Sequence, residues 1–230
     1  MAAVNLPKHV QDRAVQLLAF LYQPLVDRNV NPNYVTTVGF LVTLSSAVAF
    51  FMGHTRVGGL LVLLGGLMDI IDGQVARRTG MASVFGSFYD STLDRISEVA
   101  VFIGIFSLYS GGHPDFGYPW MVYTVALALA GSLMISYTRA KAEALGLNCS
   151  IGMMQRTERV VLIGGAALIF GGAFQGAVLT VVLIVMAVLT NFTAFQRIVW
   201  VYRNTAAPVS EPVMVDRKRV KVTSDTRKNS

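Results

Sequence analysis

The sequence predicts an all-α integral membrane protein with six transmembrane helices and an N-terminal amphipathic interfacial helix. Hydrophobic residues make up 53% of the 230 positions and charged residues only 14%, and the mean hydropathy is +0.55. Six apolar stretches each approach the roughly 20 residues that a helix needs to cross a bilayer. A single cysteine excludes an internal disulfide framework and a cysteine-based metal site.

Residues 1–30 are expected to form the amphipathic helix, lying in the plane of the membrane surface. Charged residues interrupt this stretch and no cleavage site follows it, which is not typical of a secretory signal. A helix packed on the bundle is the alternative, and both interpretations can hold. Apolar residues recur at helical spacing, at Val10, Ala14, Leu17, Leu18, Leu21 and Leu25.

Residues 31–205 are expected to form one membrane domain of six helices. Gly104, Ala126, Ala128 and Gly131 are small residues that let the third and fourth spans pack closely with neighbours. The fifth span is short, so it is expected to tilt or to begin deep in the membrane. The six spans are expected at 33–53, 57–78, 83–110, 118–145, 157–172 and 176–202.

The distribution of positive charge predicts the orientation of the six spans. If both termini lie on one side, the loops near 54–56, 111–117 and 171–175 lie on the other, and only Arg56 of the 19 Lys and Arg residues falls in them. The positive-inside rule then places both termini in the cytoplasm, at the cell membrane. The basic tail 206–230 is expected to be disordered and to favour anionic lipid headgroups. It lacks the aromatic or Gly-rich pattern of a nucleic-acid-binding segment, so no nucleic acid partner is expected.

Four aspartates stand within residues 69–94, between strongly apolar stretches. On a helix, Asp69 and Asp72 are about 60° apart and Asp90 and Asp94 about 40° apart, so each pair shares one face. The short connection between the two helices contains a glycine, and the two acidic faces can therefore meet in a hairpin. Ionisable groups at membrane depth usually face a polar cavity and indicate function.

Clustered carboxylates require a counter-charge, because four of them cannot all stay ionised side by side. Divalent cations with oxygen ligands are the simplest counter-charge, and two such ions would suit phosphoryl chemistry. Gly73 and Gly86 leave room beside the acids for a bulky ligand. The alternative is that the acids cap helices and pair with Arg77, Arg78 and Arg95, although caps would not need four acids on two inward faces.

Polar residues at three other helix ends have both structural and functional interpretations. Asn33 and Thr36 can cap the first span, and Ser83 can cap the third. Arg156 and Arg159 lie at the start of a helix, where the helix dipole does not favour cations. A bound phosphate would explain them, since arginine matches phosphate oxygens. The alternative is that arginines at the membrane edge pair with Glu143 and Glu158.

The pattern Asp-x2-Asp-Gly-x2-Ala-Arg-x8-Gly-x3-Asp-x3-Asp is matched at every position from Asp69 to Asp94. It resembles the motif of the CDP-alcohol phosphotransferases, membrane enzymes of phospholipid synthesis. The resemblance implies that Asp69, Asp72, Asp90 and Asp94 hold two Mg²⁺ or Mn²⁺ ions, with Asp94 as general base and CDP-diacylglycerol as donor. The nucleotide-binding residues that it implies are Asn33, Thr36, Asp69, Gly73, Ala76, Arg77, Ser83 and Gly86.

The stretches Tyr-Thr-Arg-Ala-Lys-Ala-Glu at 137–143 and Arg-Thr-Glu-Arg at 156–159 resemble the bacterial phosphatidylinositol-phosphate synthase branch. Thr157 departs from the usual proline and Gln155 from the usual acid of that branch. The branch implies a phosphorylated polyol as acceptor, inositol 1-phosphate, with glycerol 3-phosphate as the alternative, and the family implies a homodimer. The implied acceptor-phosphate residues are Arg139, Lys141, Arg156, Arg159 and Arg197.

Two interpretations from other classes are a cation transporter and a catalytically inactive scaffold. A transporter predicts acids spread across the membrane, whereas these four lie near one end, beside an arginine and two glycines. A scaffold predicts decay in the motif, and every position of the motif is intact. Neither alternative should recognise a cytidine nucleotide, so binding of CDP would separate both from the enzyme.

Overall fold

The computed structural model describes residues 19–111, 113–149 and 151–205, and regular structure in these ranges is entirely helical. Six helices match the six predicted spans to within a few residues. Residues 1–18, which are part of the predicted surface helix, and the predicted basic tail, residues 206–230, lie outside the described residues. The elements are α2 Ala19–Asp27, α3 Pro32–Phe51, α4 Thr55–Thr79, α5 Val84–Ser110, α6 Met121–Ala144, α7 Arg156–Ile169, η1 Ala173–Gly176 and α8 Ala177–Thr205.

The first residues of α3 follow from an Asn-Pro pair. The side chain of Asn31 accepts a hydrogen bond from the backbone N–H of Asn33 at 3.0 Å, and Pro32 is the first helical residue. Proline suits this position because the N–H that it lacks would have no partner inside the helix. The prediction that Asn33 or Thr36 caps the helix is therefore wrong, because the helix begins before either residue.

The hairpin between α4 and α5 is closed by two local features. Gly80 follows α4 with a φ of 70°, a left-handed conformation that glycine adopts without strain. Ser83 then caps α5, since its hydroxyl accepts a hydrogen bond from the backbone N–H of Gly86 at 2.9 Å. The predicted cap at Ser83 is confirmed, and it brings the first turn of α5 back beside the last turns of α4.

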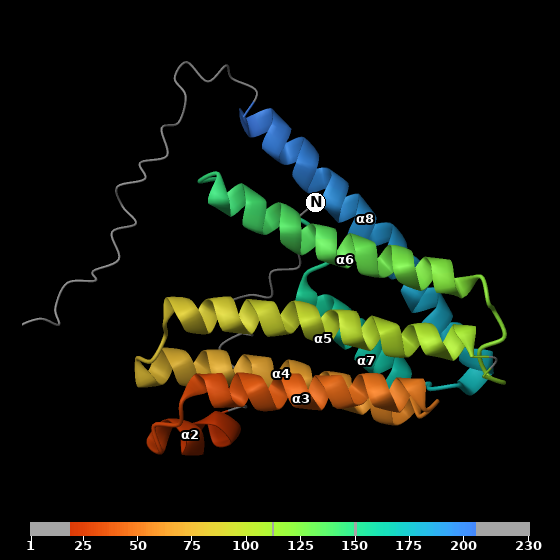
Figure 1. Cartoon of the computed structure of the whole chain (residues 1–230), viewed down its shortest axis with the longest axis horizontal. Coiled ribbons are helices and arrows are strands. Elements are labelled where there is room, and N and C mark those ends of the chain that lie inside the picture. Colours follow the sequence, from red (N-terminus) through yellow and green to blue (C-terminus); the bar gives the residue numbers. More distant parts are fainter. Residues whose placement is uncertain (1–18, 112, 150, 206–230) are drawn as a thin grey trace, which may run out of the picture.

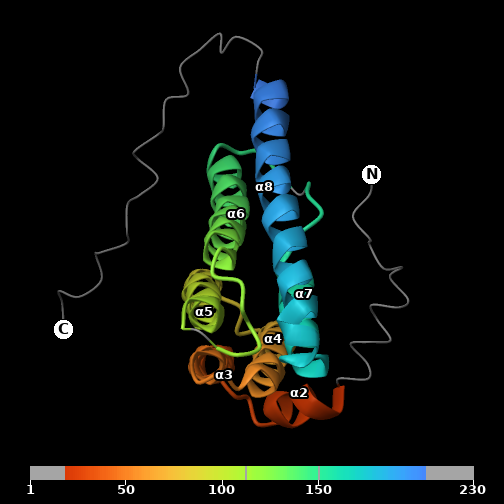
Figure 2. The same cartoon turned by 90° about the vertical axis from the view of Figure 1, so that its right-hand side faces the viewer.

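The helices form two groups (Figures 1 and 2). Helices α3, α4 and α5 lie side by side, α7 packs on α4, and α2 covers the outer side of α4. Helices α6 and α8 form a second, long pair that contacts α5 and α7. In Figure 1 this pair diverges from α5 toward the end where α4 joins α5, here termed the site end.

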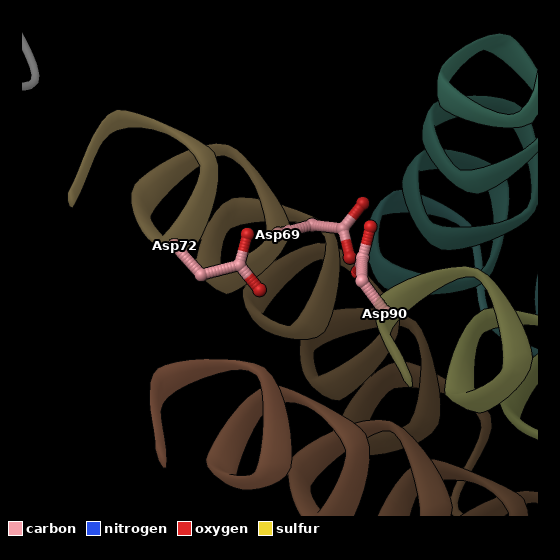
Figure 3. A group of neighbouring side chains, drawn as sticks. All are labelled: Asp69, Asp72 and Asp90. Carbon is pink, nitrogen blue, oxygen red and sulfur yellow. The ribbon is translucent and has the colours of Figure 1, made fainter. Parts of the chain in front are cut away.

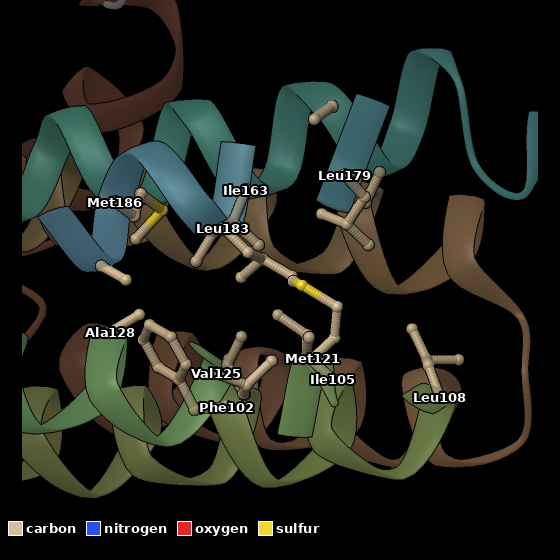
Figure 4. Close-up of a cluster of buried hydrophobic side chains, with 14 of the residues drawn as sticks. Phe102, Ile105, Leu108, Met121, Val125, Ala128, Ile163, Leu179, Leu183 and Met186 are labelled. Atoms are coloured by element: carbon tan, nitrogen blue, oxygen red, sulfur yellow. The ribbon is translucent and has the colours of Figure 1, made fainter. Parts of the chain in front are cut away.

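The main hydrophobic core lies where the two groups meet (Figure 4). It fixes α5 and α7 against α6 and α8 through close contacts between aliphatic and aromatic side chains, which also hold helices together in a lipid environment. These four helices also surround a large cavity at the site end, described below. The buried residues at the centre of this core include Phe102, Ile105, Val125, Ile163, Leu183 and Met186.

A smaller core attaches α2 to α4 near the acidic motif. Tyr22 is 1% exposed and packs with Val35, Ile71 and Val75. The guanidinium carbon of Arg78 lies 4.6 Å from the centre of the Tyr22 ring, which is a cation–π contact. The short helix therefore holds the end of α4 that carries the first half of the motif.

Within the described residues, four helical segments are long and apolar enough to cross a membrane: α3, α4, α6 and the continuous segment of η1 and α8. Large apolar side chains such as Phe51, Val188 and Phe195 are exposed on the outside of the bundle, where lipid would cover them. Two of the predicted spans do not meet the same criteria. Helix α5 carries four charged residues within its first 15 residues, and α7 has only 14 residues, in agreement with the prediction that the fifth span is short.

Glycines allow three close helix approaches inside the bundle. A Cβ atom on Gly104 would lie 2.9 Å from the Cα of Ala47 on α3, and one on Gly131 would meet Asn191 on α8. The predicted role of these two glycines in close packing is confirmed. On α4, a Cβ atom on Gly59 would lie 2.7 Å from the carbonyl oxygen of Gly164 on α7. Backbone atoms cannot move aside as a flexible side chain can.

The approach of α4 to α7 gives the first testable prediction. Gly59→Ala is expected to destabilise the protein by about 1–3 kcal/mol, because the added methyl group overpacks the contact. Gly165→Ala is the matched control, because a Cβ atom there meets nothing within 4 Å. It should be neutral or stabilise α7 by up to about 1 kcal/mol. Thermal unfolding in detergent measures both, and equal unfolding temperatures would contradict the close approach.

Candidate functional site

Three of the four predicted aspartates gather at one place near the site end. One carboxylate oxygen from each of Asp69, Asp72 and Asp90 lies within 4.8 Å of those of the other two. Figure 3 shows Asp69 and Asp90 reaching toward each other from α4 and α5, with Asp72 one turn further along α4. These three residues are here termed the acid cluster. The predicted helical hairpin with facing acids is therefore present.

The acid cluster has the properties of a divalent-cation site. Asp72 is 6% exposed, and its Oδ2 atom and the Oδ1 atom of Asp90 are buried without a hydrogen-bond partner. Buried polar atoms in folded proteins are nearly always paired, so an unpaired carboxylate oxygen requires an explanation such as a bound ion. Magnesium and manganese bind oxygen ligands of this kind. The donor set therefore fits the metal that the sequence predicted.

Asp94 lies one turn beyond Asp90 on α5, outside the acid cluster. Its Oδ1 atom is 2.6 Å from Nη2 of Arg156, and its Oδ2 atom is 3.9 Å from Nη2 of Arg95. Arg156 also forms an ion pair with Asp69, so one guanidinium joins Asp94 to the acid cluster. That Asp94 binds metal stays a prediction. Arg156, which pairs with both Asp94 and Asp69, links its carboxylate to the acid cluster.

The predicted nucleotide-binding residues form two neighbouring groups beside the acids. Gly86 faces Asn33 and Ser83, because a Cβ atom on it would lie 3.2 Å from Oδ1 of Asn33 and 3.0 Å from Oγ of Ser83. On α4, the Arg77 guanidinium lies over Gly73, 3.4 Å from where its Cβ atom would be.

The two remaining nucleotide-binding candidates lie on α3 and α4. Thr36 is buried on α3 and its hydroxyl donates a hydrogen bond to the carbonyl of Pro32. Ala76 is half-buried on α4, immediately before Arg77. The ends of α3, α4 and α5 thus bring all of these residues to the site end.

A cavity of about 980 Å³ lies beside the acid cluster, between α5, α6, α7 and α8. It reaches the cluster, because Asp90 is part of its wall. Lys141 is exposed on the last turn of α6 and is not among the lining residues. The cavity, here termed the arginine cavity, is lined by Arg95, Arg139, Arg156, Arg159 and Arg197 together with the hydroxyl residues Ser87, Ser91, Thr92, Ser136, Tyr137 and Thr157.

The arginines of this cavity are held by different partners. Arg139 pairs with Glu143 at 2.8 Å, which is the structural alternative considered for it. Arg197 is 4% exposed and donates to the carbonyl oxygens of Ile151 at 2.8 Å and Ile135 at 2.6 Å. Among the described residues no carboxylate is in ion-pair contact with Arg197. Its guanidinium is thus fixed by neutral groups, and its positive charge stays available to an anion.

Glu98 is a central residue of the site that the sequence interpretation missed. Its Oε1 atom accepts hydrogen bonds from Nε of Arg159 at 2.9 Å and from the hydroxyl of Ser132 at 2.9 Å, and its Oε2 atom pairs with Nη1 of Arg95 at 3.0 Å. The Arg159 side chain is only 3% exposed. Glu98 follows Asp94 by four residues, so its place on the same helix face could have revealed it.

The structural alternative required Glu158 to pair with arginines at the membrane edge. In the described residues it forms no such ion pair. Its carboxylate accepts a hydrogen bond from the backbone N–H of Gln155 at 2.9 Å and so caps the start of α7. Arg156 and Arg159, on the same turn, point instead to acids of α4 and α5. The first turn of α7 therefore places two guanidinium groups in the space between the two helix groups.

Comparisons with known proteins agree with this geometry. The family model for CDP-alcohol phosphatidyltransferase matches residues 29–193. An archaetidylinositol phosphate synthase from Methanothermobacter thermautotrophicus is 37% identical over 181 residues, covering 78% of this chain and 88% of that protein. A phosphatidylinositol phosphate synthase from Streptomyces avermitilis is 34% identical over 190 residues, covering 79% and 76% of the two chains.

Solved structures resemble the whole bundle. The Mycobacterium tuberculosis phosphatidylinositol phosphate synthase with CDP-DAG bound superposes with a TM-score of 0.72 at 29% identity, covering 88% of this chain and 98% of that one. The same enzyme in complex with manganese and citrate gives a TM-score of 0.71 at 30% identity, with coverages of 86% and 91%. The metal in that neighbour is of the class that the acid cluster fits.

Proposed function

The chain belongs to the CDP-alcohol phosphatidyltransferase family, and we propose that it transfers the phosphatidyl group of CDP-diacylglycerol to a hydroxyl of inositol 1-phosphate. The products are phosphatidylinositol phosphate and CMP. One observation carries this proposal: the acid cluster adjoins a cavity lined by five arginines. The acid cluster suits a pyrophosphate with divalent cations, and the arginine cavity suits a phosphorylated, polar acceptor.

The residue roles extend the proposal. Asp69, Asp72, Asp90 and Asp94 would hold two Mg²⁺ or Mn²⁺ ions, which when bound neutralise charge on the pyrophosphate. Residues at the ends of α3, α4 and α5 bind the cytidine nucleotide: Asn33, Thr36, Asp69, Gly73, Ala76, Arg77, Ser83 and Gly86. Residues of α6, α7 and α8 that line the cavity bind the acceptor phosphate: Arg139, Arg156, Arg159 and Arg197, with Lys141 exposed on α6 outside the cavity wall.

Asp94 is proposed as the general base. The acceptor hydroxyl forms a bond to the phosphorus next to diacylglycerol, the bond from that phosphorus to CMP breaks, and the hydroxyl proton passes to the Asp94 carboxylate. Support comes from the location of Asp94, one turn from Asp90 and in contact with Arg156, which lines the arginine cavity. The base is thus next to both the donor site and the acceptor site.

The membrane arrangement is part of the same proposal. Helices α3 to α8 make six spans in one domain of residues 31–205, preceded by an interfacial helix within residues 1–30 and followed by a cytoplasmic tail. The four apolar segments support the spans, and the scarcity of Lys and Arg in the opposite loops, which contain only Arg56, supports a cytoplasmic site end. We propose a homodimer in the cell membrane, surrounded by lipid.

The names of the relatives support inositol phosphate as the acceptor. The archaeal and the bacterial relatives differ in the lipid part of their names and share the inositol phosphate part. The hydroxyl residues of the arginine cavity support a polyol in the same way, since each can exchange hydrogen bonds with a sugar hydroxyl. The phosphate of the acceptor accounts for the arginines.

A competition between acceptors tests this function. With purified enzyme, magnesium and labelled CDP-diacylglycerol, kcat/KM for inositol 1-phosphate is expected to exceed that for free inositol by about a hundredfold or more, because charge-assisted hydrogen bonds to the phosphate are lost with inositol. Glycerol 3-phosphate, which keeps the phosphate, is the matched control for the polyol. A preference for glycerol 3-phosphate would make the protein a phosphatidylglycerophosphate synthase instead.

A further inference from the structure

We propose that Arg156 couples metal binding to capture of the acceptor phosphate, by exchanging the carboxylates of the metal site for that phosphate. The inference rests on the proposed function, and it assigns to one residue a role that links the metal site to the acceptor-phosphate site. Arg156 forms ion pairs with Asp69 on α4 and, at 2.6 Å, with Asp94 on α5. It is also a lining residue of the arginine cavity.

The contacts of Arg156 are with oxygens that divalent cations would also use. Asp69 belongs to the acid cluster, and Asp94 is the next acid on α5. A carboxylate shared between a guanidinium and a divalent ion interacts less favourably with each of them, because the two cations repel each other at short range. Metal binding therefore weakens the hold of Asp69 and Asp94 on Arg156.

The other arginines of the cavity each have a partner that metal binding leaves in place. For Arg95 this partner is Glu98 at 3.0 Å, besides its longer contact with Asp94 at 3.9 Å. Arg159 is bound to Glu98 and to the carbonyl oxygen of Met154. Arg197 is bound to two backbone carbonyls, and Arg139 to Glu143. Among the arginines in the described part of the cavity wall, Arg156 is thus the one that forms an ion pair with a member of the acid cluster, Asp69.

The position of Arg156 in its helix favours its release. It is the first residue of α7, where the dipole of the helix disfavours a cation. Its side chain is 24% exposed, so its guanidinium can turn within the cavity, and a bound metal would replace it as the counter-charge of Asp69 and Asp94. A phosphate in the cavity would then receive its planar pair of donors. Since coupling between two ligands is reciprocal, bound phosphate should also favour metal binding.

Calorimetric titration without CDP-diacylglycerol tests the coupling, because no turnover occurs. In the wild-type protein, magnesium is expected to tighten binding of inositol 1-phosphate about tenfold. Arg156→Gln should bind inositol 1-phosphate more weakly and with the same affinity with or without magnesium. In the absence of inositol 1-phosphate, it should bind magnesium about tenfold more tightly than the wild type, because a competing cation is gone. If Arg156 only held the acids in place, Arg156→Gln would bind magnesium more weakly than the wild type instead.

Arg139→Gln is the matched control, since it removes the same charge from the same cavity but from a side chain paired with Glu143. It should keep wild-type magnesium affinity and keep the coupling. Magnesium binding that is no tighter in Arg156→Gln than in Arg139→Gln, or coupling that persists in Arg156→Gln, would overturn the inference. If the wild type did not bind inositol 1-phosphate, the proposed acceptor would be wrong, and the magnesium affinities alone would decide the role of Arg156.

Discussion

Replacement of Asp90 by asparagine is expected to lower the rate of phosphatidyl transfer by about a thousandfold or more. Asp90 is the one residue of the acid cluster that α5 contributes, and its buried Oδ1 atom has no hydrogen-bond partner. Asparagine keeps the shape but removes the negative charge, and several kcal/mol of charge stabilisation at the phosphate is lost with the metal. Each 1.36 kcal/mol in the barrier is about tenfold in rate.

Two measurements make this prediction specific. Release of labelled CMP gives the rate, and magnesium titration gives the metal affinity, which should fall together with it. Asp115→Asn is the matched control, because Asp115 lies in the α5–α6 connection, at the other end of α5 from the site. That variant should retain the wild-type rate. Near-normal transfer by Asp90→Asn would exclude the acid cluster as the metal site.

The second large effect is expected at the ion pair between Glu98 and Arg159. Glu98→Leu should destabilise the protein by about 3–5 kcal/mol, because it leaves the Arg159 guanidinium buried without its counter-charge. The Arg159 side chain is 3% exposed and that of Glu98 9% exposed, so water cannot replace the lost partner. Thermal and denaturant unfolding in detergent measure the loss.

The double variant Glu98→Leu with Arg159→Met separates stability from function. Two apolar side chains of similar size can replace a buried ion pair at little cost, so the double variant should regain most of the lost stability. It should not regain acceptor binding, because Arg159 is a proposed phosphate ligand. KM for inositol 1-phosphate should rise while the affinity for CDP-diacylglycerol is unchanged. A double variant as unstable as Glu98→Leu would show that the pair does not act as a unit.

The helices and the acid cluster were predictable because both depend on regular spacing. Apolar stretches near 20 residues and polar turns located six helices to within a few residues. The i, i+3 and i, i+4 spacing of Asp69, Asp72, Asp90 and Asp94 placed the acids on facing sides of one hairpin, and three of the four carboxylates meet there. Neighbouring helices joined by a short loop leave little freedom for other arrangements.

Contacts between distant helices were not predictable in the same way. The sequence offered Glu143 and Glu158 as partners for the arginines because they are close along the chain. The structure gives Glu143 to Arg139 but uses Glu158 as a cap, and it pairs Arg159 with Glu98, 61 residues away. The packing of α7 on α4, which lets its arginines reach α5, decides these partners, and no local spacing encodes it.

The shortness of α7 has a consequence for how the two reactants meet. Fourteen helical residues extend about 21 Å, whereas the hydrocarbon layer is about 30 Å thick. If its far end reaches the opposite surface, Arg156 and Arg159 begin the helix roughly 10 Å below the level of the lipid headgroups. In that arrangement the arginine cavity would have to admit the acceptor phosphate below the membrane surface. The lipid need not rise out of its leaflet for its phosphorus to be attacked.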